Sequence, residues 1–563
     1  MCGIAGIIGL NPALPEIDAM LLSQQHRGPD AKIIRSLKNA FLGHNRLSII
    51  DLSDAANQPM TSNCGRYVIV FNGEIYNYKE LRSELVHEYE FKNASDTEVL
   101  LAAFIKWKSA ALERCNGMFS FAIWDIEAQQ LFAARDRFGV KPFYYAIHNN
   151  HFYFSSEIKA FFAAGIKKQK NSKVWANYYC YGTYGLPNET FWRNINQLPA
   201  GHFLEVDGAG KMIRIEKWYD FPTRIAQIHA MPDAVLREKY ESLLADAIQL
   251  RFRADVPLGM NVSGGLDSSL LIALVNEQLN SEKSIEAFTF YSDNTTYDEL
   301  PWVIELMKTT TYPLNKVLFS AVDIPQLIEK VSYHQDEPFG GFPTLAYSQL
   351  FKAARKENIP VILDGQGMDE AWAGYDYYHN DSNQIIQGVV TSPVRPEAIT
   401  EEFRQFSRKE MYEMPFQSHL QNLQYRDLFY TKIPRALRFN DRISMMHGTE
   451  LREPFLDYRL VELAFAQSDA MKMQNGQTKW LLRDLAQKHL GKQIALAPKR
   501  PLQTPQREWL SGELKDYANE QIARFSSFDF VNKKEVQAIW TAYCNGNQDN
   551  SFYIWQWINS AVL

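Results

Sequence analysis

The sequence predicts a mixed protein in two parts: an α+β part built on antiparallel sheet, then an α/β part on a parallel sheet that ends in helices. Three observations predict this. Residues 118–155 form short alternating runs of apolar and polar side chains separated by turns, as antiparallel strands do. Between residues 258 and 375, short apolar runs are separated by stretches of helical spacing, which is typical of parallel sheets. A chain of 563 residues is also too long for one ordinary core.

Composition excludes several classes of protein. With 46% hydrophobic and 22% charged residues the chain is globular, and its net charge of -6 gives no general reason to bind nucleic acid. Its five cysteines, Cys2, Cys64, Cys115, Cys180 and Cys544, include no C-x-x-C pair, so neither a disulfide framework nor a zinc site is indicated. The apolar opening lacks a basic region, and no run approaches the ~18 apolar residues of a membrane span. We therefore expect a cytoplasmic protein without signal peptide or membrane anchor.

The first residues carry a nucleophile at the second position. If Met1 is removed, Cys2 bears a thiol and an α-amino group on the same carbon. Such an amine, with an unperturbed pKa of about 7.7 to 8.0, can act as the base that activates the thiol. Taken alone, Cys2 is equally well explained as a small hydrophobic residue of an edge strand.

Four motifs favour the catalytic interpretation of Cys2. HRGPD (His26–Asp30), GHNRLSIID (Gly43–Asp51), FNGEIYN (Phe71–Asn77) and SDTEVL (Ser95–Leu100) follow one another in the order and spacing of the class II glutamine amidotransferases. The first two hundred residues therefore resemble this family of N-terminal-nucleophile (Ntn) glutaminases. The resemblance implies an αββα sandwich that hydrolyses glutamine.

The resemblance also implies roles for single residues. Cys2, the side-chain amide of Asn72 and the backbone N–H of Gly73 are expected to be catalytic, the last two as the oxyanion hole. The arginine of the RLS stretch grips the glutamine α-carboxylate in that family, and the acidic residues hold its α-ammonium. The expected glutamine-binding residues are Arg46, Leu47, Ser48, Asn72, Gly73, Glu74 and Asp96.

The Asn72–Gly73 pair also fits a two-residue hairpin turn after the strand expected at 67–71. Against a hairpin, the residues that follow do not alternate. Ile75, Tyr78 and Leu81 recur at helical spacing instead, so a helix is expected there.

The antiparallel part continues to about residue 206. Strands are expected at 118–125, 131–135, 142–147 and 151–156, with aromatic side chains in their core. We predict a glutaminase domain over 2–206, a linker over 207–231 that begins with the turn DGAGK, and a second domain over 232–563. A helix should open at 232–233, with an apolar stripe formed by Leu236, Tyr240, Leu243 and Ala247.

The second part is organised around SGGLDSS (Ser263–Ser269). An apolar strand at 258–262 precedes it and a helix follows, so its glycines and free N–H groups form a site for an anion such as phosphate. The P-loop lysine is missing, and Asp267 requires a divalent cation between itself and phosphate. The stretch resembles the PP-loop ATP pyrophosphatases, which form adenylates. The ATP-binding residues expected here are Val262, Ser263, Gly264, Gly265, Asp267 and Ser268.

Two further parallel strands should carry the rest of the nucleotide site. Strands at 285–292 and from 359 place Phe290, Asp364 and Gly365 next to the first loop, because ligands lie at the carboxyl ends of such strands. Asp369 is the second expected Mg²⁺ ligand beside Asp267. The stretch PVILDGQGMDE strongly resembles the second ATP-site motif of the asparagine synthetases.

Three C-terminal motifs extend that resemblance: DRISMMHGTELREPFLD (Asp441–Asp457), QTKWLLRDL (Gln477–Leu485) and PKRPLQTPQREWL (498–510). It implies that Lys479 binds the pyrophosphate or the adenylate. Glu450 and Arg452 match family positions at the acceptor or adenylate site. From the sequence, they are explained equally well as a buried ion pair.

The resemblance to the glutamine-hydrolysing asparagine synthetases covers nearly the whole chain. It implies that Cys2 releases ammonia from glutamine, and that Mg-ATP adenylates a carboxylate, aspartate or an analogue, which the ammonia then attacks. Free ammonia would be protonated and lost, so a channel between the domains is expected. The implied cofactors are ATP and Mg²⁺, and the resemblance is compatible with a homodimer.

One residue departs from the family pattern. The family has GEGxDE where this chain has GQGMDE, so Gln366 stands in place of a glutamate that positions ammonia or accepts its proton. An amide cannot act as a base. We therefore keep a second hypothesis, that the acceptor is a uronic-acid sugar, a peptide or a natural-product intermediate rather than aspartate. A PP-loop enzyme acting on tRNA and a non-catalytic scaffold are remoter alternatives, and the acidic balance weighs against the first.

Overall fold

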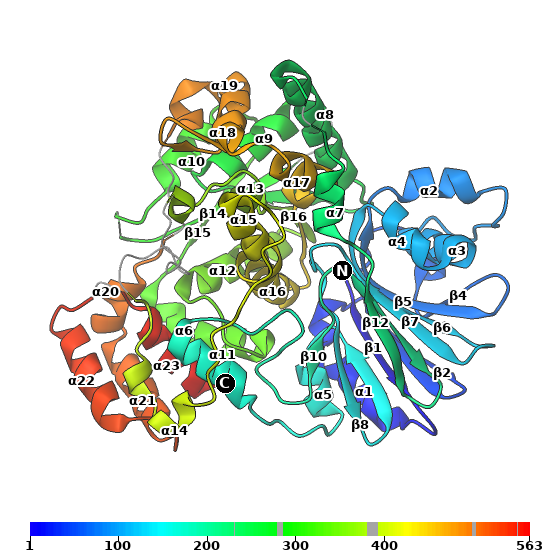
Figure 1. Cartoon of the computed structure of the whole chain (residues 1–563), viewed down its shortest axis with the longest axis horizontal. Helices are drawn as coiled ribbons and strands as arrows, with labels where there is room; N and C mark the ends of the chain where they lie inside the picture. The colour runs from blue at the N-terminus through cyan, green and yellow to red at the C-terminus, as the bar shows by residue number, and fades with distance from the viewer. Residues whose placement is uncertain (230, 279–284, 295, 380–391, 498–502, 549) are drawn as a thin grey trace.

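The computed structural model describes residues 1–563 except 230, 279–284, 295, 380–391, 498–502 and 549. Figure 1 shows two layers of strands from the N-terminal part packed beside a larger, mostly helical C-terminal part. The predicted fold class is confirmed: an Ntn-type αββα sandwich is followed by a parallel sheet and a helical C-terminal region. None of the helices in the described ranges is both long and apolar enough to cross a membrane.

The N-terminal part contains two six-stranded antiparallel sheets. The first has the order β10 (Asn196–Gln197), β8 (Tyr144–His148), β9 (His151–Ser155), β1 (Gly3–Ile8), β3 (Ala40–Arg46) and β2 (Ala31–Leu37). The second has the order β12 (Met212–Lys217), β11 (His202–Asp207), β7 (Gln130–Arg135), β6 (Gly117–Asp125), β5 (Tyr67–Ile75) and β4 (Met60–Thr61).

The alternation of side chains in β1 explains how the layers form. Ile4 and Ile8 point into the core between the two sheets, whereas Ala5 and Ile7 pack on the helical side, because successive side chains of a strand face opposite ways. Helices α1 (Leu14–Ser23), α5 (Lys159–Ala163) and α6 (Ser172–Tyr181) belong to that outer core of the first sheet. Helices α2 (Tyr78–Leu85), α3 (Asp96–Trp107) and α4 (Ala111–Arg114) share the outer core of the second sheet.

The segment 207–231, which the sequence predicts to be a linker, contains regular structure. Residues Met212–Lys217 form the edge strand β12, which pairs with β11, and helix α7 follows at Phe221–Ala226. Ile213 and Ile215 of β12 are exposed. The strand therefore buries no apolar stripe, and its sequence looks like that of a loop although its backbone is paired. The second sheet therefore extends beyond residue 206, and the proposed domain boundaries remain predictions.

The C-terminal part is built on a five-stranded parallel sheet. Its order is β15 (Leu314–Leu318), β14 (Glu286–Tyr291), β13 (Leu258–Asn261), β16 (Val361–Leu363) and β17 (Glu450–Arg452). Helices α8 (Asp233–Arg251) and α9 (Leu266–Gln278) cover one face, and α12 (Phe342–Lys356) and α16 (Lys432–Met445) cover the other. Leu236, Tyr240 and Ala247 of the predicted stripe of α8 are buried. Leu243 is only half-buried, and its neighbour Leu244 is buried instead.

The remaining helices form the C-terminal region. They are α10 (Leu300–Met307), α11 (Ile324–Gln335), α13 (Met368–Ala371), α14 (Glu401–Arg404), α15 (His419–Phe429), α17 (Tyr458–Phe465), α18 (Asp469–Lys472), α19 (Trp480–Ala495), α20 (Gln506–Ser511), α21 (Lys515–Ser526), α22 (Lys533–Cys544) and α23 (Phe552–Val562), with a small hairpin of β18 (Met473–Gln474) and β19 (Gln477–Thr478). The start of the 498–510 motif, at 498–502, lies outside the described residues.

The two parts share a continuous core. Met1, Leu47 and Ile49 of the first part belong to the same buried cluster as Met260 and Leu363 of the parallel sheet. Helix α6 likewise packs on the C-terminal helix α23, where Tyr179 donates a hydrogen bond to Ser560 at 2.8 Å. The parts are therefore joined by packed apolar surface on more than one side.

Candidate functional site

Cys2 lies at a small cavity lined by residues of the N-terminal part. The cavity has a volume of about 30 Å³, enough for one or two waters. Its lining includes these predicted residues: Cys2, Arg46, Leu47, Gly73, Glu74 and Asp96. The Cys2 Sγ lies 3.9 Å from the carbonyl oxygen of Leu47, and burial raises the pKa of the thiol. Residues from Cys2 to Asp96, which are far apart in the sequence, thus line one cavity.

Asn72 and Gly73 lie within strand β5 and not in a hairpin turn, so the hairpin interpretation is wrong. The Asn72 Oδ1 accepts a hydrogen bond from the Cys2 N–H at 3.0 Å. Its Nδ2 is buried and has no hydrogen-bond partner among the described residues. A side chain added at Gly73, which has a φ of 154°, would meet the Met118 oxygen at 2.1 Å. The position therefore requires glycine, and Asn72 holds an unused donor beside the nucleophile.

The guanidinium of Arg46 is fixed by the loop that follows β3. It donates hydrogen bonds to the Ser53 oxygen at 2.7 Å and to Asn57 Oδ1 at 2.8 Å, and it also contacts the Asp51 oxygen. Two of the predicted residues, Ser48 and Asn72, do not line the cavity, and the Ser48 N–H donates a hydrogen bond to Asp30 at 2.7 Å.

Two buried carboxyl groups, Glu74 and Asp96, complete this site. Burial, and then the neighbouring Glu450, raise the pKa of Glu74 well above its usual range. Burial raises the pKa of Asp96 to about 7, although the Ile75 N–H donates a hydrogen bond to it at 2.8 Å. A cation entering the cavity would favour the ionised form of both groups. The arrangement can hold an ammonium group.

Glu450 and Arg452 do not lie at the cavity of the second part, where the family match places them. Both are fully buried on β17 and face the N-terminal part. The Met1 ammonium donates a hydrogen bond to Glu450 at 2.8 Å, and Arg452 contacts Glu450 at 2.5 Å and Glu74 at 3.5 Å. The structure thus agrees with the ion-pair alternative, because alternate residues of β17 point toward the glutaminase side.

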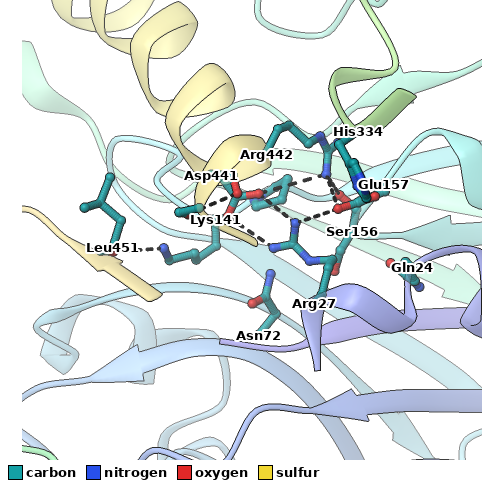
Figure 2. Close-up of polar contacts among 12 residues, drawn as sticks. Gln24, Arg27, Asn72, Lys141, Ser156, Glu157, His334, Asp441, Arg442 and Leu451 are labelled. Atoms are coloured by element: carbon teal, nitrogen blue, oxygen red, sulfur yellow. Dashed lines mark hydrogen bonds and ion pairs between the residues drawn. The ribbon is translucent and has the colours of Figure 1, made fainter. Parts of the chain in front are cut away.

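A network of buried charges connects Cys2 to helix α16. The Arg27 Nε donates a hydrogen bond to the Cys2 oxygen at 3.0 Å, and its two other nitrogens contact Asp441 of α16 at 2.8 and 3.1 Å. Figure 2 shows Arg27 between Asp441 and Glu157, and Arg442 lies opposite Arg27, 3.9 Å from Asp441 and 3.4 Å from Glu157. The sequence motifs contain Arg27 and Asp441, but nothing in the sequence pairs them, since they lie in different motifs 414 residues apart.

The second site is a cavity of about 510 Å³ at the carboxyl ends of β13 and β16. SGGLDSS forms the turn between β13 and α9, as predicted, and Ser268 Oγ donates a hydrogen bond back to the Ser263 oxygen at 2.7 Å. The predicted residues that line the cavity are Ser263, Gly264, Gly265, Asp267, Ser268, Asp364, Gly365, Gln366, Asp369 and Lys479. The structure therefore brings together both loops and the C-terminal lysine.

Lys479 lies between the two aspartates expected to bind the metal. Its Nζ is 2.6 Å from Asp267 and 2.8 Å from Asp369. Burial alone would lower the pKa of Lys479, but the two carboxylates raise it. Both carboxylates thus reach one cation, so this pair fits a divalent ion, with phosphate oxygens and water as its other ligands. In the described residues, no group of three metal-binding side chains exists.

Val262 and Phe290 line a recess beside the large cavity and not the cavity itself. The recess shares Ser263, Tyr347 and Asp364 with the cavity, and Tyr347 donates a hydrogen bond to Asp364 at 2.8 Å. Deeper in the recess, both amide atoms of Asn261 are buried without a hydrogen-bond partner in the described part of the chain. The recess has a volume of about 30 Å³, so by itself it can hold only one or two waters or the edge of a larger group that lies in the cavity.

Several residues of the large cavity escaped the sequence analysis. Tyr347 and Arg483 lie on helices that were expected only as packing elements, and Arg483 stands within the QTKWLLRDL motif. Lys432 and Arg435 come from α16, one turn apart, where the sequence shows no matching motif. The spacing of two cations at positions i and i+3 was the only available signal, and it is common on solvated helices.

The cavities at Cys2 and at Ser263 have no lining residue in common. Residues of β17 and α16, among them Glu450 and Asp441, lie between the two parts. The channel between them stays a prediction.

Comparisons with known proteins match both parts of the chain. Residues 1–219 match the glutamine amidotransferase domain family, and residues 239–563 match the asparagine synthase family. Glutamine-hydrolysing asparagine synthetase 1 of Bacillus subtilis is 28% identical, over 99% of this chain and 95% of that protein. A putative glutamine-hydrolysing asparagine synthetase 2 of Methanocaldococcus jannaschii is 36% identical, over 67% of this chain and 76% of that protein. Amidase chry2 of Gibberella zeae is 25% identical, over 95% and 94% of the two chains.

Proposed function

Because the chain belongs to the asparagine synthase family, we propose that it is a glutamine-dependent ligase that converts a carboxylate to an amide with Mg-ATP. The observation that carries the proposal is the meeting of Asp267 and Asp369 at one cation, beside the SGGLDSS turn and inside a cavity large enough for substrates. The proposed division of labour is a glutaminase domain at 2–206 and an amide-forming domain at 232–563.

Glutamine hydrolysis is assigned to the cavity at Cys2. After loss of Met1, the Cys2 amine would act as base and its thiolate would attack the glutamine side-chain carbonyl. The unpaired Nδ2 of Asn72 and the Gly73 N–H supply the donors that such an oxyanion needs. Arg46 would hold the α-carboxylate, and Glu74 and Asp96, whose raised pKa values mark them as poorly neutralised, would hold the α-ammonium. The C–N bond breaks to give ammonia and a thioester, which water then cleaves to glutamate.

Carboxylate activation is assigned to the 510 Å³ cavity. Adenine is assigned to the part of the cavity next to the recess at Val262 and Phe290, because the recess itself, at about 30 Å³, is too small to hold the ring. Asp267 and Asp369 would hold Mg²⁺, which supplies charge neutralisation for the phosphates. An acceptor carboxylate oxygen bonds to the α-phosphorus as pyrophosphate leaves, and ammonia then displaces AMP from the acyl carbon and releases one proton. Lys479 would move from the aspartates to the departing pyrophosphate.

Aspartate is the first candidate acceptor, since two of the relatives are named asparagine synthetases. A second candidate, a different carboxylic acid, is favoured by Gln366 in the cavity wall, because an amide cannot accept the proton that ammonia releases. The similarity to a protein named an amidase supports the same alternative.

The test is an amidation assay with amide-¹⁵N glutamine, Mg-ATP and a panel of carboxylic acids, in which AMP, pyrophosphate, glutamate and labelled amide are measured. The expected result is one of each product per turnover. Cys2→Ala should abolish the use of glutamine and retain amidation from ammonium salts. If pyrophosphate forms from ATP with no acid of any kind, or Cys2→Ala leaves glutamine-dependent amidation intact, the proposal fails.

A further inference from the structure

One end of the large cavity is lined by cations and aromatic rings from three distant segments. Lys432 and Arg435 come from the first turn of α16, Tyr184 comes from the loop after α6, and Phe552 begins α23. Phe439, one turn further along α16, completes this end. None of these five residues belongs to the SGGLDSS or the DGQG turn, so they are available to a second ligand beside the nucleotide.

The two cations lack an anionic partner among the residues that the structure describes. Within the described part of the chain, neither Lys432 nor Arg435 forms a hydrogen bond or an ion pair through its side chain. Their nearest partners are rings: Lys432 Nζ lies 5.1 Å from the centre of Tyr375, and the Arg435 guanidinium lies 5.6 Å from the centre of Tyr184. Ring faces compensate only part of the lost hydration of a cation. Burial, and then the neighbouring Arg435, lower the pKa of Lys432 to about 7.

The acidic groups near Lys432 are already engaged. Asp427 of α15 accepts hydrogen bonds from Tyr377 at 2.5 Å and Tyr378 at 2.8 Å, and Glu370 of α13 accepts one from Tyr375 at 2.6 Å. Lys432 and Arg435 are half-buried at the cavity wall, so an anion that binds between them would compensate the hydration that each has lost. The pair therefore indicates an anionic ligand group.

The carboxylates of the cavity belong to its other side. Asp267, Glu299, Asp364 and Asp369 come from the loops that follow β13, β14 and β16, and among the described residues none of the five at the α16 end is acidic. An amino acid acceptor needs a carboxylate for its α-ammonium as well as a cation for its α-carboxylate. The α16 end offers cations and ring faces, and the two acidic groups near it, Asp427 and Glu370, are engaged with tyrosine hydroxyls.

We propose that the acceptor is a carboxylic acid that carries a second anionic group and a ring, but no ammonium group. The second anion binds between Lys432 and Arg435, and the ring packs against Tyr184, Phe439 and Phe552. A uronic acid phosphate is the simplest molecule with all of these features. This inference rests on the proposed amide-forming reaction and names its substrate class. Lys432 and Arg435 are then specificity-determining residues, and they act on the acceptor and not on ATP.

The experiment compares two matched pairs of acceptors on the full chain. Glucuronic acid 1-phosphate and glucuronic acid differ by the second anion, and succinate and aspartate differ by the ammonium group. The expected result is a kcat/KM at least tenfold higher for the first member of each pair, with glucuronic acid 1-phosphate the best of the four. Equal or better use of aspartate would overturn the proposal while leaving the amide-forming function intact.

Variants test the two residues directly. Lys432→Met and Arg435→Met should each raise the KM for glucuronic acid 1-phosphate at least tenfold, and change the KM for ATP and for glucuronic acid less than twofold. Lys432→Arg should restore most of the affinity. Lys534→Met, at an exposed lysine of α22, is the control for loss of a positive charge. An unchanged acceptor KM in both methionine variants would overturn the proposal.

A binding measurement separates this inference from the catalytic proposal. Calorimetric titration of glucuronic acid 1-phosphate into protein saturated with an uncleavable ATP analogue and Mg²⁺ requires no turnover. Binding to the wild type and its loss in Lys432→Met would support the substrate class even if no acid is amidated. Turnover of aspartate without any binding of the sugar phosphate would refute it.

Discussion

Replacing Asn72 with alanine should separate glutamine hydrolysis from folding stability. The side chain has two functions in the structure: its Oδ1 accepts a hydrogen bond from the Cys2 N–H, and its Nδ2 is buried without a partner. The first contact stabilises the fold by about 1 kcal/mol, whereas an unpaired buried donor costs about 1–3 kcal/mol. The two effects oppose each other, so the free energy of unfolding of Asn72→Ala should stay within about 1–2 kcal/mol of the wild type.

Catalysis should respond far more strongly. If Nδ2 donates to the oxyanion only as it forms, its loss should lower the glutaminase kcat by about 10²–10³-fold, or about 2.7–4 kcal/mol. Glutamate release measures this effect, and urea unfolding measures stability. Amidation from ammonium salts should keep its rate, and Asn188→Ala, at an exposed amide, should change neither activity. A glutaminase kcat within threefold of the wild type, with the protein folded, would refute the assignment of Asn72.

Four further predictions concern the other groups. Asp267→Asn and Asp369→Asn should each abolish pyrophosphate release from ATP and spare glutamine hydrolysis, because each removes one of the two carboxylates that meet at Lys479; pyrophosphate release above a tenth of the wild-type rate would contradict this. Gly73→Ala should prevent a stable fold or an active glutaminase, as measured by unfolding and glutamate release, since its Cβ would lie 2.1 Å from the Met118 oxygen. Glu450→Gln should lower the free energy of unfolding by about 3–5 kcal/mol, since a buried Arg452 loses its partner. In the wild type, the ion pairs lower the pKa of Glu450 to about 2 although burial raises it. Glu450 therefore stabilises the fold above its unfolded pKa, and this stabilisation is lost as the pH falls toward 2. The KM for a phosphorylated acceptor should rise as the pH increases through about 7, because Lys432 loses its proton there. Burial, Arg435 and Arg426 lower the pKa of Lys432 to about 7, although Asp427 and Glu370 raise it. Lys432→Arg should make the KM less dependent on pH.

Much of the fold could be predicted because its signals are local. The alternation in 118–155 and the apolar runs at 258–262 and 285–292 correspond to β6 to β9, β13 and β14, since side-chain period decides which backbone can bury its apolar face. Strand β12 was not predicted, because it lacks such a local signal. Its isoleucines are exposed, so the strand buries no stripe that a sequence pattern could reveal.

The candidate sites divide in the same way. Arg46 and Gly73 could be assigned to one site from their motifs, and Cys2 from its position next to the N-terminus; Asp267, Asp369 and Lys479 could likewise be assigned from motifs. Contacts between residues of different motifs leave no signal in the sequence. The contact of Arg27 with Asp441, and the direction in which Glu450 points from β17, depend on how the two parts dock. Lys432 and Arg435 are informative only once the cavity is known.

The burial of Met1 affects when that residue can be removed relative to folding. Met1 is 1% exposed, and its ammonium is enclosed with Glu450, which β17 contributes from the far end of the sequence. A peptidase that removes the initiating residue has to reach that peptide bond while β17 has not yet docked. The proposed glutaminase reaction requires that Met1 is removed, and we expect this to happen during or soon after synthesis, before β17 docks. If the protein folds with Met1 still attached, the Met1–Cys2 peptide bond is buried and Cys2 has no free amine.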